Sequence, residues 1–235
     1  MRRNKLIFAA LLASLTLLGC DEGDIEEHDE RVQTSGKIAK LTAHITGIDS
    51  WSSQYSIVLA GFAEGNSNAI VQKRLLDSDE VTTLSLTSDD IATIELCVTN
   101  RLRERIATFA TVSAQQLQGD TVYLDAGNVD LGMYKTIQDL VFTGTCARCH
   151  GLGATPAGDL TLVEGQSYAQ LVNHPARIEA GGMRVVPGSA ATSLLHKVIH
   201  GDSEAGVRFD HSNMIKEQNT ITLIDNWINN GAAED

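Results

Sequence analysis

The sequence lacks several features that would each point to a different class of protein. Lysine and arginine together number 18 against 30 acidic residues, which gives a formal net charge of −12. Nucleic-acid binding depends on clustered basic side chains, so this balance excludes a nucleic-acid partner. The glycine-rich stretch 151–158, "GLGATPAG", is not followed by the G-K-[ST] of a phosphate-binding loop. The apolar run Leu6–Leu18 is too short for a membrane-spanning helix. Hydrophobic residues make up 43% of the chain, enough for a packed core.

The N-terminus is typical of an exported protein. Basic residues open the chain, the apolar run follows, and "LLGC" ends at Cys20. This ending resembles the bacterial lipobox, which implies cleavage before Cys20 and lipidation of its thiol. The alternative is an ordinary signal peptide with a chance cysteine. We therefore expect residues 1–20 to be a lipoprotein signal peptide and the acidic stretch 21–36 to be a flexible tether.

Short strand-like segments fill residues 37–131. Apolar and polar residues alternate in "KLTAHIT", "QYSIVLAGF" and "VTTLSLT", and turn residues such as "GNSN" and "SDD" separate the segments. About six or seven short strands of this kind predict an all-β sandwich, possibly immunoglobulin-like. We expect Cys97, within the apolar "TIELCVTN", to be buried and His44 to have a structural role.

The periodicity changes in residues 132–235. "MYKTIQDLVF" has apolar residues near helical spacing, and "NTITLIDNWINNG" places its apolar residues on one helix face with Gly231 as a stop. Two amphipathic helices are therefore expected to bracket a region of helix and loop.

The stretch "TGTCARCHG", residues 143–151, carries the most specific chemistry. A zinc knuckle is disfavoured because a closed zinc site needs four ligands, and the chain has no second C-x-x-C. A thioredoxin-like redox pair would need a βαβ context. A disulfide between Cys146 and Cys149 would explain neither His150 nor the helices. Haem c fits each part, because two thiols three positions apart can bond the two vinyl groups and the next histidine can bind the iron.

Residues from about 133 to 232 resemble the monohaem cytochrome c domain of many bacterial proteins. The pieces that carry the resemblance are "CARCHG", "LTLVEGQSYAQLVNHPA", "VVPGSAATSLLHKVIHGD" and "ITLIDNWINNGA". The resemblance implies covalent attachment of one haem c at Cys146 and Cys149, and His150 as the proximal iron ligand. It also implies packing of Trp227 where the first and last helices cross. The expected fold is thus two-domain, with the all-β sandwich over 37–131 and an all-α cytochrome c-like domain over 132–235.

The distal iron ligand is less well defined, because the sequence departs from the family pattern of a methionine followed by prolines. His211 lies sixteen residues before Trp227, close to the expected place, and Met214 lies thirteen before it. We favour His211 and keep Met214 as the alternative distal ligand. His196 and His200, four positions apart, share a helix face and could bind a metal, although a polar helix face is the commoner explanation.

These features predict an electron carrier rather than an enzyme: a monohaem c-type cytochrome, lipid-anchored in the bacterial cell envelope, at the periplasmic face or the cell surface. Its partners would be an unidentified redox protein and, through the N-terminal lipid, a membrane. One alternative is a haem enzyme, for instance with peroxidase-like activity, or a gas sensor with an open sixth iron position. Another is a surface binding lipoprotein in which the cytochrome is accessory.

Overall fold

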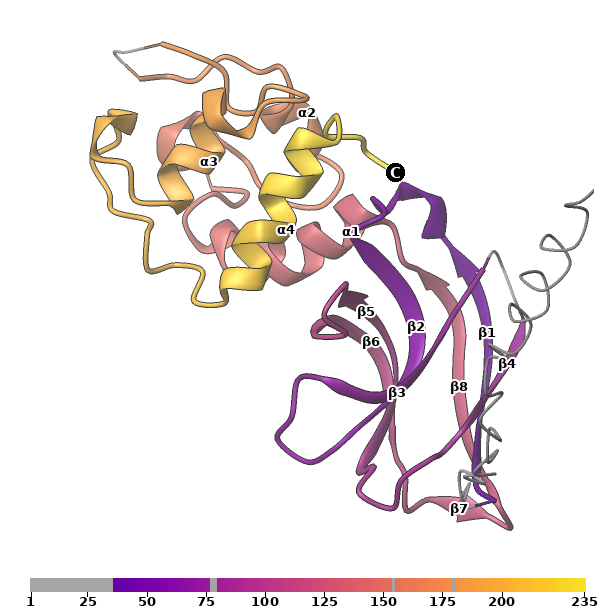
Figure 1. Cartoon of the computed structure of the whole chain (residues 1–235). Helices are drawn as coiled ribbons and strands as arrows, with labels where there is room; N and C mark the ends of the chain where they lie inside the picture. The colour runs from indigo at the N-terminus through magenta and orange to yellow at the C-terminus, as the bar shows by residue number, and fades with distance from the viewer. Residues whose placement is uncertain (1–35, 77–79, 154, 179–180) are drawn as a thin grey trace, which may run out of the picture. The chain divides into compact units, whose positions relative to one another are not determined.

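The computed structural model describes residues 36–76, 80–153, 155–178 and 181–235 (Figure 1). The predicted signal peptide, the lipidation site Cys20 and almost all of the predicted tether lie outside these ranges. Within them, no helix has the length and the apolar character needed to cross a membrane.

Eight strands occupy the first half of the described chain. They are β1 (Ile38–Thr46), β2 (Tyr55–Phe62), β3 (Ala69–Arg74), β4 (Val81–Ser85), β5 (Thr93–Asn100), β6 (Arg105–Ser113), β7 (Leu117–Gln118) and β8 (Thr121–Asp130). They form two four-stranded sheets, ordered β4-β1-β8-β7 and β3-β2-β5-β6. Most neighbouring strands are antiparallel, but β1 and β8 pair in parallel, with an irregularity in register at Thr42/Ala43.

Alternation along the strands explains which side chains form the core. In β1, Leu41, Ala43 and Ile45 are buried. Thr42, His44 and Thr46, which alternate with them, are exposed, as a period of two requires. Strands β2 and β5 are buried along almost their whole length. Cys97 of β5 is fully buried, as expected, and packs in a small apolar cluster with Val58 and Phe62 of β2. His44 is exposed on β1.

Four α-helices follow the sheets. They are α1 (Met133–Ile137), α2 (Ser167–Leu171), α3 (Leu194–Ile199) and α4 (Gln218–Asn229). Only α4, with 12 residues, is long enough to present a continuous apolar face, which buries Ile221, Ile224 and Trp227. Helix α3 ends after 6 residues because Gly201, directly after the C-cap His200, has φ +71°, a conformation that glycine adopts readily.

The predicted fold class is wrong. The described chain is mostly β, and the segment after Leu131 is not an all-α domain, because short helices alternate there with long irregular stretches. The helices expected at both ends of this segment are present, but the helices between them, α2 and α3, have only 5 and 6 residues. The expectation of an immunoglobulin-like sandwich joined to a separate all-α cytochrome c-like domain is therefore replaced by two sheets that share a core with a helix-and-loop segment.

Two hydrogen bonds and a shared core join the β part of the chain to the helix-and-loop segment. The Met133 backbone N–H donates to the Ser50 hydroxyl at 2.7 Å, and the Asn226 side-chain amide donates to the Tyr55 hydroxyl at 2.8 Å. One continuous cluster of buried apolar side chains includes residues of both parts. We conclude that the two parts stabilise each other, since each buries apolar surface of the other.

Candidate functional site

The C-x-x-C-H motif forms one tight turn shortly after α1. The backbone amides of Cys149 and His150 donate to the carbonyl of Cys146 at 3.1 and 3.0 Å. The chain then passes so close to this turn that a Cβ atom on Gly151 would lie 2.5 Å from the carbonyl oxygen of Ala147. A glycine is required at this position, and the turn brings both thiols and the imidazole together in one short segment.

The imidazole of His150 is held by a backbone carbonyl. Its Nδ1 lies 2.8 Å from the carbonyl oxygen of Ala157. Since a carbonyl can only accept, this contact places the proton on Nδ1 and leaves the Nε2 lone pair available. Burial lowers the pKa of His150, which favours the neutral form that binds metals.

His211 mirrors this arrangement. Its Nδ1 lies 2.8 Å from the carbonyl oxygen of Phe209, so its Nε2 is also available. The ring centres of His150 and His211 lie 6.2 Å apart, and the two ring planes make an angle of 23°. Two imidazoles that bind one metal ion from opposite sides, each at about 2.0–2.1 Å, have their ring centres about 6 Å apart. The sequence separates these residues by sixty positions, and the fold brings them to this spacing.

Two adjoining cavities, of about 140 and 1220 Å³, meet at these rings. Both are lined by Cys146, His150, His211 and Met214, and Cys149 lines the larger one. The smaller cavity has an apolar wall that includes Leu160, Leu162, Leu171, Leu195, Ile199 and Ile215. Sites for cofactors are commonly lined mostly by apolar side chains with a few polar groups, and the apolar wall beside two imidazoles fits that description.

The two motif cysteines are free thiols. Burial, with a smaller contribution from the neighbouring Cys149, raises the pKa of Cys146 to about 11. Cys146 is therefore a neutral thiol at physiological pH and does not act as a low-pKa redox nucleophile.

Arg184 braces the wall of the smaller cavity and was not identified from the sequence. Its side chain is 4% exposed, yet it has no carboxylate hydrogen-bond partner. The guanidinium donates to the backbone carbonyl of Gln170 at 2.8 Å and to that of Asp159 at 2.8 Å. A further bond joins it to the carbonyl of Gly158 at 3.2 Å. Ala157, whose carbonyl holds the His150 imidazole, directly precedes Gly158 and Asp159. By bonding these two residues, Arg184 fixes the loop that orients the imidazole.

The residues that the sequence predicts as haem attachment sites or iron ligands lie together in the structure. Cys146, Cys149, His150, His211 and Met214 all line the larger cavity. Met214 is 38% exposed. Leu171 also lines the smaller cavity, but Tyr168 does not. The Tyr168 hydroxyl instead donates to the Ala232 carbonyl at 2.9 Å.

Trp227 lies at the contact between α1 and α4. Its ring centre is 5.1 Å from that of Tyr134, and its Nε1–H donates to the Ala233 carbonyl at 2.7 Å. Trp227 is thus a packing residue and does not line either cavity.

Comparison of the chain with protein-family models, with curated proteins and with solved structures found no match.

Proposed function

We propose that this protein is an exported, lipid-anchored electron carrier with one haem c. The Cys146 and Cys149 thiols would form the thioether links, and His150 and His211 would be the axial iron ligands. The observation that carries the proposal is the pair of imidazoles of His150 and His211, with ring centres 6.2 Å apart at the C-x-x-C-H turn.

The residues present fit this group in three respects. The available Nε2 atoms belong to imidazoles, which are common iron ligands, and the motif thiols are free for covalent attachment. The adjoining wall is apolar, as a porphyrin face requires. A zinc site is less well supported, because one tetrahedral ion needs four ligands, and in the described residues the cysteine and histidine ligand atoms of this cavity do not form a group within 4.8 Å of one another.

Two backbone carbonyls prepare the imidazoles for this role. Ala157 and Phe209 each accept the Nδ1–H of one ring, which fixes its orientation and makes its Nε2 a better donor to a metal. When bound, haem supplies a reversible one-electron change at iron. With histidine rather than methionine as the second ligand, the reduction potential is expected to lie at the lower end for this class.

Electron transfer is favoured over catalysis because the chain offers two axial ligands. His150 and His211 would occupy both axial positions, which leaves no position at which a substrate or a gas could bind. The redox partner would be another protein, and the N-terminal lipid would keep the carrier at a membrane of the cell envelope.

The test is production of the full chain in a bacterial host that carries out c-type cytochrome maturation. We expect a haem-stained band that survives denaturing electrophoresis, and its loss in Cys146→Ala and Cys149→Ala. Cys97→Ala, which removes a buried thiol outside the motif, is the matched control and should retain the band. The reduced protein should not bind carbon monoxide rapidly.

Three results would overturn the proposal. A colourless protein would contradict haem binding, and colour lost on denaturation would contradict covalent attachment. Rapid carbon monoxide binding would show an open iron position and favour a haem enzyme or gas sensor.

A further inference from the structure

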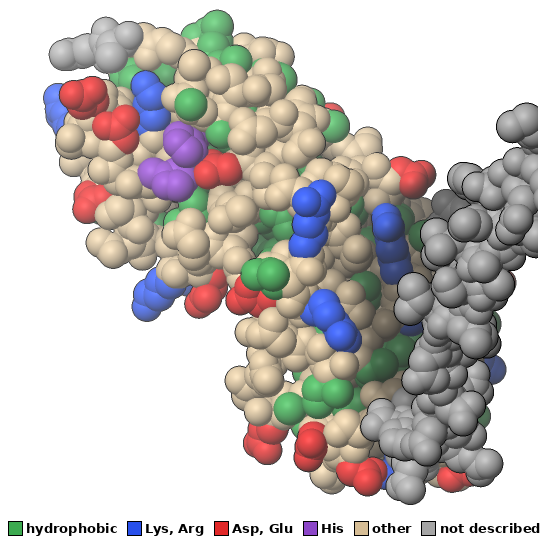
Figure 2. All heavy atoms as spheres, viewed as in Figure 1, with side chains coloured by type: hydrophobic (Ala, Val, Ile, Leu, Met, Phe, Trp, Pro, Cys, Tyr) green, Lys and Arg blue, Asp and Glu red, His purple; other side chains and the backbone are tan. Residues whose placement is uncertain are grey.

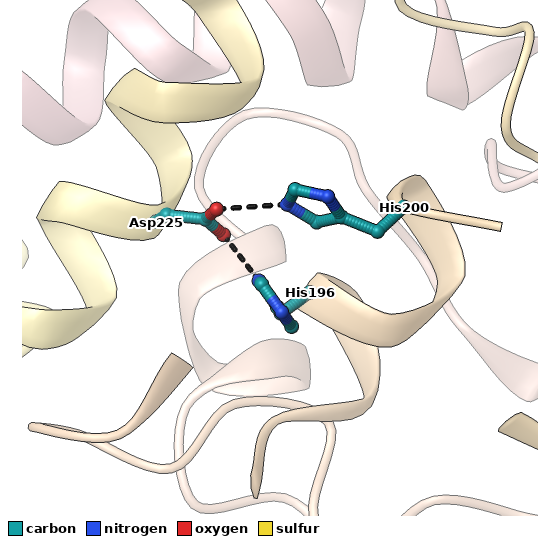
Figure 3. Close-up of side chains that lie close together, drawn as sticks. All are labelled: His196, His200 and Asp225. Carbon is teal, nitrogen blue, oxygen red and sulfur yellow. Dashed lines mark hydrogen bonds and ion pairs between the residues drawn. The ribbon is translucent and has the colours of Figure 1, made fainter. Parts of the chain in front are cut away.

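A second group of metal-binding side chains lies on the surface where α3 and α4 meet. His196 and His200 come from the α3 region, one helical turn apart, and Asp225 comes from α4. Figure 3 shows the two imidazoles converging on the carboxylate from the same side. In Figure 2, histidine side chains lie at the surface over these helices, beside an acidic side chain.

The hydrogen bonds within this group are short, and each joins one imidazole to one oxygen of the carboxylate. The Nδ1 of His196 lies 2.7 Å from one carboxylate oxygen of Asp225, and the Nε2 of His200 lies 2.8 Å from the other. The two imidazole rings have their centres 4.2 Å apart. The carboxylate therefore holds both rings in place before any ion binds, which lowers the entropic cost of binding one.

The spacing of the ligand atoms suits a first-row metal ion. One ligand atom from each of the three residues lies within 4.8 Å of the other two. Zinc bonds of about 2.0–2.2 Å keep any two ligand atoms within about 4.4 Å of each other, so small side-chain rotations would complete the site. Two histidines at i and i+4 on a helix are a recurrent zinc-binding pair.

The surroundings also favour a cation. The side chains of His196, His200 and Asp225 are 27%, 38% and 19% exposed, so an ion can reach them while water fills the remaining coordination positions. The chain carries a formal net charge of −12, which attracts cations. Two imidazoles and one carboxylate select Zn²⁺, Cu²⁺ or Ni²⁺ over Ca²⁺ and Mg²⁺, which prefer oxygen ligands.

We propose that His196, His200 and Asp225 form a surface binding site for a divalent transition-metal ion of the zinc or copper class. The site is separate from the C-x-x-C-H turn and does not depend on the proposed electron-transfer function. Between the two histidines stand Lys197, Val198 and Ile199. The glutamate that acts as general base in hydrolytic zinc helices is thus absent from this turn, and the geometry supports metal binding rather than hydrolysis.

The test is calorimetric titration of the full-length holoprotein with Zn²⁺. Wild type should show one binding event that His200→Ala and Asp225→Asn weaken at least about 10-fold, because each removes a ligand. His44→Ala is the matched control, since it removes an exposed histidine on β1, and it should bind Zn²⁺ as wild type does. Circular dichroism spectra of all four proteins would establish that they are folded.

Electron paramagnetic resonance of wild type loaded with one equivalent of Cu²⁺ gives a readout that needs no variant. Two coordinated imidazole nitrogens are expected. The proposal is overturned if wild type binds no Zn²⁺, if His200→Ala and Asp225→Asn bind it as wild type does, or if the copper spectrum shows no nitrogen ligands. Zinc binding at the motif cysteines of a haem-free protein would appear as a separate event that His200→Ala leaves intact, so failure of the electron-transfer proposal remains distinguishable.

Discussion

The ring centres of His150 and His211 lie 6.2 Å apart, and the Nδ1 of each ring is hydrogen-bonded to a backbone carbonyl. This spacing distinguishes His211 from Met214, the other candidate for the distal iron ligand. Met214 lines the same cavity, but its side chain is 38% exposed at the surface.

We predict that His211→Ala converts the iron of the holoprotein from low-spin to high-spin, because it removes one of the two strong axial ligands. Met214→Leu, which keeps the apolar volume and removes the sulfur, should leave the spectrum unchanged. Optical and electron paramagnetic resonance spectra of both variants check this. High-spin iron in Met214→Leu alone would make Met214 the ligand.

We predict that Arg184→Lys lowers the free energy of unfolding by about 1–3 kcal/mol. A lysine keeps the charge but cannot donate in several directions as the guanidinium does, so the partly buried carbonyls of Gln170 and Asp159 lose donors. Arg177→Lys is the matched control, since Arg177 is 72% exposed and pairs with Asp159 at the surface, and it should change stability by no more than about 0.5 kcal/mol. Denaturant unfolding of both variants measures the difference, and equal effects would contradict a bracing role for Arg184.

We predict that Asp235→Asn flattens the pH dependence of stability at acidic pH. Burial raises the pKa of the Asp235 carboxyl, although the backbone amides of Tyr134 and Lys135 donate to it and partly offset this shift, while Asp130 adds to it. The folded protein therefore holds this proton more tightly than the unfolded chain does. The resulting stabilisation is present below the ordinary aspartate pKa of about 3.9 and is lost as pH rises through the raised folded value.

The measurement for Asp235 is the free energy of unfolding of wild type and variant between about pH 3 and 7. The advantage of wild type over Asp235→Asn should shrink as pH rises in that range. Asp120→Asn, at an exposed turn residue, is the control. A wild-type advantage that grows with pH would show that the carboxylate is the stabilised form.

We predict that Cys20→Ser releases the protein from membranes. A lipid chain contributes about 0.8 kcal/mol for each buried CH₂ group, so loss of the acylated thiol removes the anchor. Fractionation of cells expressing wild type, Cys20→Ser and Cys149→Ser checks this, and only Cys20→Ser should become soluble. Continued fractionation of Cys20→Ser with lipid would refute the anchor.

The sequence allowed prediction of features with a local signature. The alternation in "KLTAHIT" identified β1, and the amphipathic pattern before Gly231 identified α4. The C-x-x-C-H spacing singled out Cys146, Cys149 and His150, and the order of residues in the following loop pointed to His211.

Features that arise only from tertiary structure could not be predicted. Arg184 stands in "GGMRVV" with no periodic signal, and its burial depends on carbonyls from loops distant in the sequence. The pairing of Asp225 with His196 and His200 joins residues 25 or more positions apart and exists only in the folded chain. The all-α expectation came from the resemblance to cytochrome c domains, and the residues between the first and last helices instead form short helices and irregular stretches.

The bonds from Met133 to Ser50 and from Asn226 to Tyr55 have a consequence for how this protein can be divided. A fragment that began at Met133 would present to water the apolar surface that the sheets now cover, and it would be prone to self-association. Production of the candidate site on its own therefore requires that the two sheets be kept with it.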